Sequence, residues 1–171
     1  GSMTVEQAII TAIQYESRVH KAYADQVDRI SDPAGRRIFQ TLADEEQSHL
    51  DYLHRKLEQL KQTGTVPADT LPTAIPAPQQ IEAASRKMHS HVAGSDPAND
   101  LQMLTRALEL ETQTSSFYQD MVRQLPADGQ QLFRRFVDIE QGHVAIVQAE
   151  IDFLTKSGYW FDCFEVDLDG V

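Results

Sequence analysis

The sequence has little cysteine: only Cys163 occurs among the 171 residues. A single thiol excludes an internal disulfide bond and any zinc, iron or iron–sulfur site built from several cysteines. Long apolar runs are also missing, because none approaches the roughly 20 residues that a helix needs to cross a bilayer. The N-terminus lacks a basic stretch followed by an apolar one, so we expect a cytoplasmic protein.

Basic residues are scarce. Lys and Arg number 15 against 26 Asp and Glu, which gives a formal net charge of −11. Nucleic acids and anionic membrane surfaces bind proteins through clustered positive charge, so this balance excludes both as partners. A chain of 171 residues suits one domain with a sizeable core.

Strand-like alternation of useful length is also lacking, whereas apolar residues recur at helical spacing. The sequence predicts one all-α domain over residues 4–164: a four-helix bundle made of two hairpins, at 4–63 and 96–157. A proline-rich crossover at 64–78 and a short helix at 79–93 connect the hairpins. The aromatic tail at 158–171 is expected to pack back on the bundle.

Local signals predict where several helices begin and end. Thr4 followed by Gln7 predicts a capping box, and Asp32 before Pro33 predicts an N-cap with proline at the first helical position. The apolar seam of the first helix is expected to continue as far as Ile30.

The two hairpins resemble each other residue by residue. Polar positions match at a nearly constant offset, which a shared apolar period alone would not produce. Glu16, Tyr23, Glu46 and His49 match Glu111, Tyr118, Glu140 and His143. We therefore interpret the chain as an internal duplication.

Each predicted long helix has an apolar seam whose centre carries residues of metal-binding type. They are Glu16, Glu46, His49, Glu111, Glu140 and His143. Glu and His three positions apart lie about 60° apart around a helix and about 4.5 Å apart along it, so both reach one ion. Four carboxylates in a bundle core need compensation, which two divalent cations provide. The pattern predicts a di-metal site of mixed oxygen and nitrogen ligands, typical of iron or manganese, with zinc possible.

Three further positions are open to two interpretations. His20 follows Glu16 by one turn and is either an additional ligand or an ordinary histidine at the edge of the core. Tyr23 and Tyr118 follow their glutamates on nearly the same face, where core packing explains them as well as a redox role does. Glu45 aligns with Ile139 in the duplication and is expected on the surface, facing away from the site.

The motifs Glu46-Gln47-Ser48-His49 and Glu140-Gln141-Gly142-His143, with Glu16, Tyr23, Glu111 and Tyr118, resemble the di-iron domain of rubrerythrins, in the ferritin-like superfamily. The resemblance covers residues from about Val5 to about Phe164. It implies a ferritin-like fold and two iron ions held by the six ligands above. It also implies that Tyr23 and Tyr118 hydrogen-bond to ligand carboxylates and are the candidate catalytic residues.

The sequence departs from the rubrerythrin pattern in two respects. Members that reduce peroxide carry one more glutamate, at the position that Thr114 occupies here, and most carry a rubredoxin domain, whose cysteines are absent. Electrons would therefore come from a separate protein donor.

The resemblance implies a non-haem di-iron or di-metal oxidoreductase that reacts with hydrogen peroxide or O2, and a homodimer is expected. The alternative is a ferroxidase or iron-binding ferritin-like protein. A second alternative is a metal-binding bundle without turnover.

Overall fold

The structure is a computed structural model, and it describes residues 3–67, 69–87 and 97–162. Its helices are α1 (Val5–Ala24), the short 3-10 helix η1 (Val27–Arg29), α2 (Pro33–Thr63), α3 (Pro78–Lys87), α4 (Pro97–Gln124) and α5 (Ala127–Ser157). The described ranges contain no strand. The all-α prediction is therefore confirmed for this part of the chain. The predicted continuation of the short helix to residue 93 lies outside the described residues.

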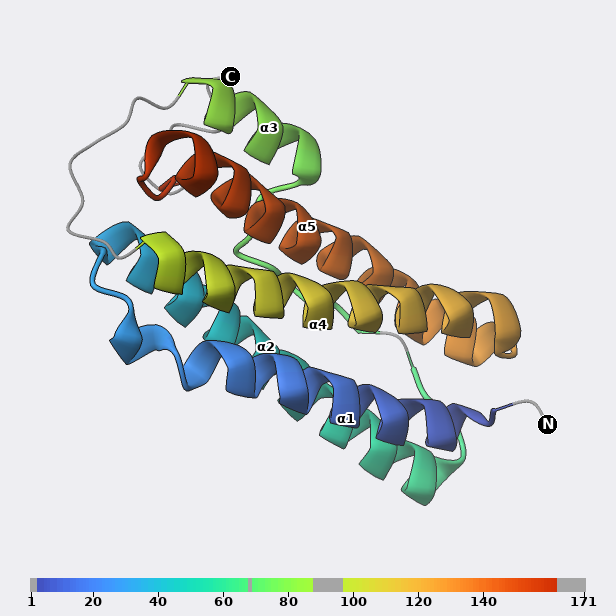
Figure 1. Cartoon of the computed structure of the whole chain (residues 1–171). Coiled ribbons are helices and arrows are strands. Elements are labelled where there is room, and N and C mark those ends of the chain that lie inside the picture. The colour runs from blue at the N-terminus through green and yellow to red at the C-terminus, as the bar shows by residue number, and fades with distance from the viewer. Residues whose placement is uncertain (1–2, 68, 88–96, 163–171) are drawn as a thin grey trace.

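The four long helices form a bundle. Helix α1 packs on α2, α4 packs on α5, and α1 also packs on α4. Figure 1 shows α1 and α4 side by side, with α2 and α5 behind them. After α2 the chain crosses to the far end of the bundle, where α3 packs on α5. Every long helix therefore contributes a face to one common interior.

Helix ends follow the local signals in the sequence. The Thr4 hydroxyl accepts the backbone N–H of Gln7 at 3.1 Å, and the Gln7 side chain accepts the backbone N–H of Thr4 at 2.9 Å. The Asp32 carboxylate accepts two backbone N–H groups of the first turn of α2, at 2.7 and 3.2 Å. Both predicted caps are confirmed. Gly64 and Gly158 end α2 and α5 with φ of 76° and 78°, the left-handed conformation that glycine adopts without strain.

The predicted extension of the first helix to Ile30 is wrong. Helix α1 ends at Ala24, and the chain turns through η1 before α2 begins. Ile30 is nevertheless fully buried, because the corner folds its side chain into the core. Apolar spacing reports burial, and here a tight corner buries the residue as a helix would.

The buried apolar side chains form two clusters along the bundle. On α1, Ile9 and Ala12 belong to one cluster, and Val19 and Tyr23 belong to the other. Glu16, which is also fully buried, lies between these two pairs. Each apolar cluster stabilises its end of the bundle, because burial of apolar surface contributes about 25 cal/mol per Å². This stabilisation offsets the cost of the buried polar residues that lie between the two clusters.

The described part of the aromatic tail packs on the bundle, as expected. Trp160 is fully buried and its indole N–H donates to the Asp100 carboxylate at 2.9 Å. The backbone N–H of Phe161 donates to the buried Glu150 at 2.7 Å. Cys163 and the rest of the tail lie outside the described residues.

We expect Gly35→Ala to loosen the docking of the tail. A Cβ at Gly35 would lie 2.6 Å from a ring carbon of Trp160 and 2.8 Å from a methyl group of Ile30. Overpacking of this kind costs about 1–3 kcal/mol. Urea denaturation of the metal-free protein, followed by fluorescence of its one tryptophan, measures this loss. The matched control is Gly142→Ala in α5, whose Cβ would meet nothing closer than 3.6 Å.

The control variant should be neutral or slightly stabilising, because alanine favours a helix interior over glycine by about 1 kcal/mol. A Gly35→Ala protein within about 0.5 kcal/mol of wild type would show that the close approach of Trp160 is not needed.

Candidate metal centre

The six predicted ligands meet in the middle of the bundle. Helix α1 supplies one glutamate, α4 supplies another, and α2 and α5 each supply a Glu-x-x-His pair. The side chains are those of Glu16, Glu46, His49, Glu111, Glu140 and His143, and all six residues are 0% exposed.

These side chains fall into two overlapping groups, in each of which the potential ligand atoms lie within 4.8 Å of one another. One group is Glu16, Glu46, His49 and Glu140, and the other is Glu46, Glu111, Glu140 and His143. Glu46 and Glu140 belong to both groups. The structure thus places the two Glu-x-x-His glutamates in the shared position, and Glu16 and Glu111 in one group each.

Both histidines point the same ring nitrogen into their group. His49 Nδ1 lies 3.2 Å from Glu16 Oε1, 3.6 Å from Glu46 Oε2 and 3.8 Å from Glu140 Oε1. His143 Nδ1 lies 3.1 Å from oxygens of both Glu46 and Glu111, and 4.0 Å from Glu140 Oε2. The two rings are nearly parallel, with centroids 5.6 Å apart and an angle of 8° between their planes.

Many polar atoms of this centre lack hydrogen-bond partners. Among the described residues, nine buried side-chain N and O atoms have none, and eight of them belong to the six residues of the two groups. An unsatisfied buried polar atom costs about 1–3 kcal/mol, so such a concentration requires a compensating group. Two divalent cations would satisfy these atoms and balance four carboxylates. The buried Glu and His groups could therefore hold metal ions, and their mixed oxygen and nitrogen donors are of the kind that transition metals accept.

Without metal, the centre retains protons. Burial and the neighbouring Glu16 raise the pKa of Glu46 to about 8, and burial and Glu16 raise the pKa of Glu140 well above its usual range. Burial lowers the pKa of His49, but Glu16 and Glu46 outweigh it and raise this pKa to about 10. Burial also raises the pKa of Glu16, but the adjacent protonated Glu46 and the charge of His49 lower it to about 2. Metal binding would therefore release protons.

Two buried tyrosines hold the outer glutamates. Tyr23 donates its hydroxyl to Glu111 Oε2 at 2.9 Å, and Tyr118 donates to Glu16 Oε1 at 2.6 Å. Each tyrosine thus contacts the glutamate of the other helix pair. Burial and the adjacent carboxylates raise the pKa of both phenols well above the ordinary value. Both hydroxyls keep their protons at neutral pH and orient the carboxylates.

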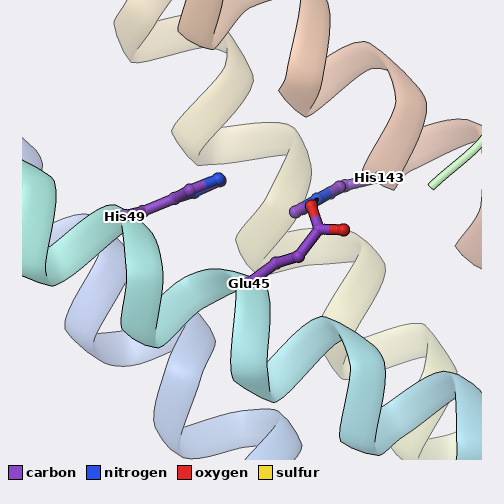
Figure 2. A group of neighbouring side chains, drawn as sticks. All are labelled: Glu45, His49 and His143. Atoms are coloured by element: carbon purple, nitrogen blue, oxygen red, sulfur yellow. Dashed lines mark hydrogen bonds and ion pairs between the residues drawn. The ribbon is translucent and has the colours of Figure 1, made fainter. Parts of the chain in front are cut away.

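The prediction that Glu45 lies on the surface is wrong. Glu45 is 8% exposed and accepts a hydrogen bond from His143 Nε2 at 2.9 Å. Its carboxylate also accepts the Thr73 hydroxyl and the backbone N–H of Ala74, both at 2.7 Å. Figure 2 shows Glu45 and His49 rising from α2, with the His143 ring beside the Glu45 carboxylate.

The physical reason for this error is the crossover segment, which covers this face of α2 and supplies two hydrogen-bond donors. Helical spacing cannot reveal such a cover. One signal was present in the sequence: the counterpart of Glu45 is Ile139, an apolar residue, and the structure buries that position as well, at 2% exposure.

The remaining candidates lie outside the two groups. His20 is half-buried and belongs to neither, so its interpretation as an additional ligand gains no support. Thr114 is fully buried, and its hydroxyl donates to the backbone carbonyl of Leu110 at 2.8 Å. Because threonine has no carboxylate, this position lacks the extra glutamate that peroxide-reducing rubrerythrins carry there.

The centre is closed to bulky molecules. A hollow of about 620 Å³ between α3 and α5 is lined by residues such as Ile81 and Phe153, and by none of the six clustered residues. The six side chains are also 0% exposed, so none of them is open to solvent.

Among the described helices, none is both long enough and apolar enough to cross a membrane.

Comparison with known proteins adds no relative: no family model matches the chain, and neither a curated protein nor a solved structure matches it significantly. The fold and the buried cluster thus define the chain as a helical bundle whose Glu and His groups could hold metal ions.

Proposed function

We propose that the protein is a ferritin-like, non-haem di-iron oxidoreductase that reacts with hydrogen peroxide or O2, similar to rubrerythrins. The observation that carries the proposal is the pair of overlapping ligand groups joined by Glu46 and Glu140. Carboxylate–histidine sites of this composition, built from facing helices of a bundle, are typical of di-iron proteins. The matching helix pairs would each supply half of the centre, as an internal duplication implies.

The residues of this chain have separate tasks in such a reaction. Two Fe²⁺ ions would supply one electron each which, with two protons, convert hydrogen peroxide into two molecules of water. Glu16 and His49 would hold one ion, Glu111 and His143 the other, and Glu46 and Glu140 would contact both. Tyr23 Oη and Tyr118 Oη keep the outer carboxylates in place.

Complete burial of the centre supports a small oxidant. The six side chains are 0% exposed, which excludes bulky organic substrates and most bulk water. Charged groups inside such a site interact more strongly than they do in water. We expect a separate protein donor to re-reduce the iron, because one cysteine among these 171 residues is too few to form a rubredoxin centre within them. We propose that the protein carries out this reaction as a homodimer in the cytoplasm.

A second candidate is a ferroxidase that binds and passes on iron. The net charge of −11 favours it, since an acidic protein attracts Fe²⁺ from solution. The same centre would then receive iron as substrate rather than keep it as a resident cofactor.

Anaerobic loading with Fe²⁺, followed by stopped-flow mixing with peroxide or with O2, tests these functions. We expect two iron ions per chain, faster oxidation by peroxide, and a dimer by light scattering. Glu111→Gln should lose one iron and the rapid oxidation. Its matched control is Glu109→Gln, because Glu109 lies two positions away on α4 and is exposed.

The other outcomes select the alternatives. A large particle with many irons per chain would favour the ferroxidase. Two tightly bound irons that neither oxidant attacks would leave a metal-binding bundle without turnover. A protein that takes up no metal would overturn all three functions.

A further inference from the structure

The two histidines of the centre differ in the hydrogen bonding of Nε2, the ring nitrogen that faces away from the shared glutamates. His143 Nε2 donates to Glu45 at 2.9 Å. His49 Nε2 is buried and has no hydrogen-bond partner among the described residues. The residue that matches Glu45 in the second helix pair is Ile139, which has no acceptor to offer. The two halves of the centre are therefore unequal in this respect.

Glu45 is firmly placed. Its Oε1 accepts the Thr73 hydroxyl as well as His143, and its Oε2 accepts the backbone N–H of Ala74. Three donors around one carboxylate favour its ionised form, and an ionised carboxylate can only accept. In the neutral form of the ring that binds metal, the hydrogen of His143 therefore sits on Nε2, which leaves Nδ1, facing Glu46 and Glu111, as the ligand nitrogen.

Such an arrangement prepares a histidine for metal. A carboxylate behind a metal-binding imidazole fixes the tautomer and the ring orientation and raises the basicity of the ligand nitrogen. His49 lacks this support, because its Nε2 has no acceptor among the described residues to fix the tautomer and raise the basicity of Nδ1. Glu46 and Glu140 contribute to both metal positions alike, so they do not remove the difference between His143 and His49.

We propose that Glu45, held by the crossover residues Thr73 and Ala74, is a positioning residue for His143 and makes the two metal positions unequal. The position formed with Glu111 and His143 binds its ion first and more tightly than the position formed with Glu16 and His49. This inference rests on the di-metal centre of the proposed function. It adds the order in which the two positions bind their ions. It also gives the crossover segment a part in setting that order, through its hydrogen bonds to Glu45.

Glu45 also belongs to a third set of neighbouring potential ligands, with His49 and His143. Direct metal binding by Glu45 is less favourable, because its two oxygens already accept three hydrogen bonds. It would also require His143 to give up the hydrogen on Nε2 while Nδ1 binds the neighbouring ion. The experiment below separates a positioning role from a ligand role.

Titration of the metal-free protein with Co²⁺, followed by its visible absorption and by calorimetry, tests the inference. Wild type should bind two ions in two steps of different affinity. Glu111→Gln should abolish the tighter step, and Glu16→Gln the weaker one, which assigns each step to its position. Glu45→Gln should weaken the tighter step about 10–100-fold and leave the weaker step unchanged.

Two variants sharpen the result. Thr73→Val removes one donor to Glu45 and should weaken the same step by a smaller factor. Asp44→Asn changes the exposed neighbour of Glu45 and should change neither step. A merely structural role of Glu45 would lower the unfolding midpoint and weaken both steps together.

Each remaining outcome overturns a defined statement. Two equal steps in wild type, or equal weakening of both by Glu45→Gln, would overturn the inference and leave the di-metal centre intact. A third ion in wild type that Glu45→Gln loses would make Glu45 a ligand. A wild-type protein that binds no Co²⁺ and no Fe²⁺ would overturn the proposed function and the inference together.

Discussion

We expect that replacing Glu46 by alanine removes both metal ions of the proposed centre, whereas replacing Glu16 by alanine removes only one. The difference follows from geometry, because Glu46 belongs to both ligand groups and Glu16 to one. Each group without Glu46 keeps three side chains, and the two groups then share only Glu140. We expect metal analysis after anaerobic loading to fall from two ions per chain to none for Glu46→Ala.

The control for this experiment is Glu109→Ala, which removes an exposed glutamate with the same loss of charge. It should retain both ions, and circular dichroism should show that all variants keep their helices. If Glu46→Ala keeps one ion, the shared position of Glu46 is wrong. If the double variant Glu16→Ala, Glu111→Ala still binds two ions, the proposed ligand set itself is wrong.

Metal saturation of the proposed centre should raise the stability of the protein by an amount comparable with its whole stability. Each site at a free metal concentration about 1,000 times its dissociation constant adds about 4 kcal/mol, so two sites add about 8 kcal/mol. For a chain of this size, about 1 kcal/mol shifts the melting temperature by roughly 2–4 °C. We therefore expect a rise of roughly 15–30 °C between protein in EDTA and metal-saturated protein, measured by scanning calorimetry.

The stability of the metal-free protein should fall as the pH rises above about 5. Glu46 has a pKa of about 8 in the folded protein against 4.5 ordinarily, so its buried carboxyl destabilises the fold increasingly across that range. His49 has a pKa of about 10 against 6.5, so its contribution is complete below 6.5 and is lost as the pH rises through 10. Both slopes have the same sign.

Glu16 acts in the opposite direction at low pH. Its folded pKa of about 2 lies below the ordinary 4.5, so its stabilisation is present above 4.5 and is lost as the pH falls through 2. Each extra proton held by the folded state changes the stability by about 1.4 kcal/mol per pH unit. Urea denaturation in EDTA at pH 6 and pH 8 measures the fall in stability that Glu46 and His49 cause over this range. A metal-free protein that is more stable at pH 8 than at pH 6 would contradict it.

Bound metal should flatten this dependence. Metal ions replace the protons that Glu46 and His49 hold, so the gain in melting temperature on metal binding should be larger at pH 8 than at pH 6. An equal gain at both pH values would show that these groups are already free of protons in the metal-free protein.

The sequence by itself determined the helices, most of their ends and which residues could be ligands. Thr4 and Asp32 act on the backbone within their own helices, so their capping needs no distant contact. The six clustered residues could be found for a related reason. Charged residues in the middle of an otherwise apolar stripe must face the core, because the helical period turns all members of the stripe in one direction.

Only the tertiary structure decided how these residues are used. That Glu46 and Glu140 share both groups depends on how four helices meet, which no single period describes. The role of Glu45 depends on Thr73 and Ala74, which follow it by nearly 30 residues in the crossover and have no periodic pattern of their own. Hydrogen bonds between distant segments are set by the path of the chain in space, and local spacing carries no record of that path.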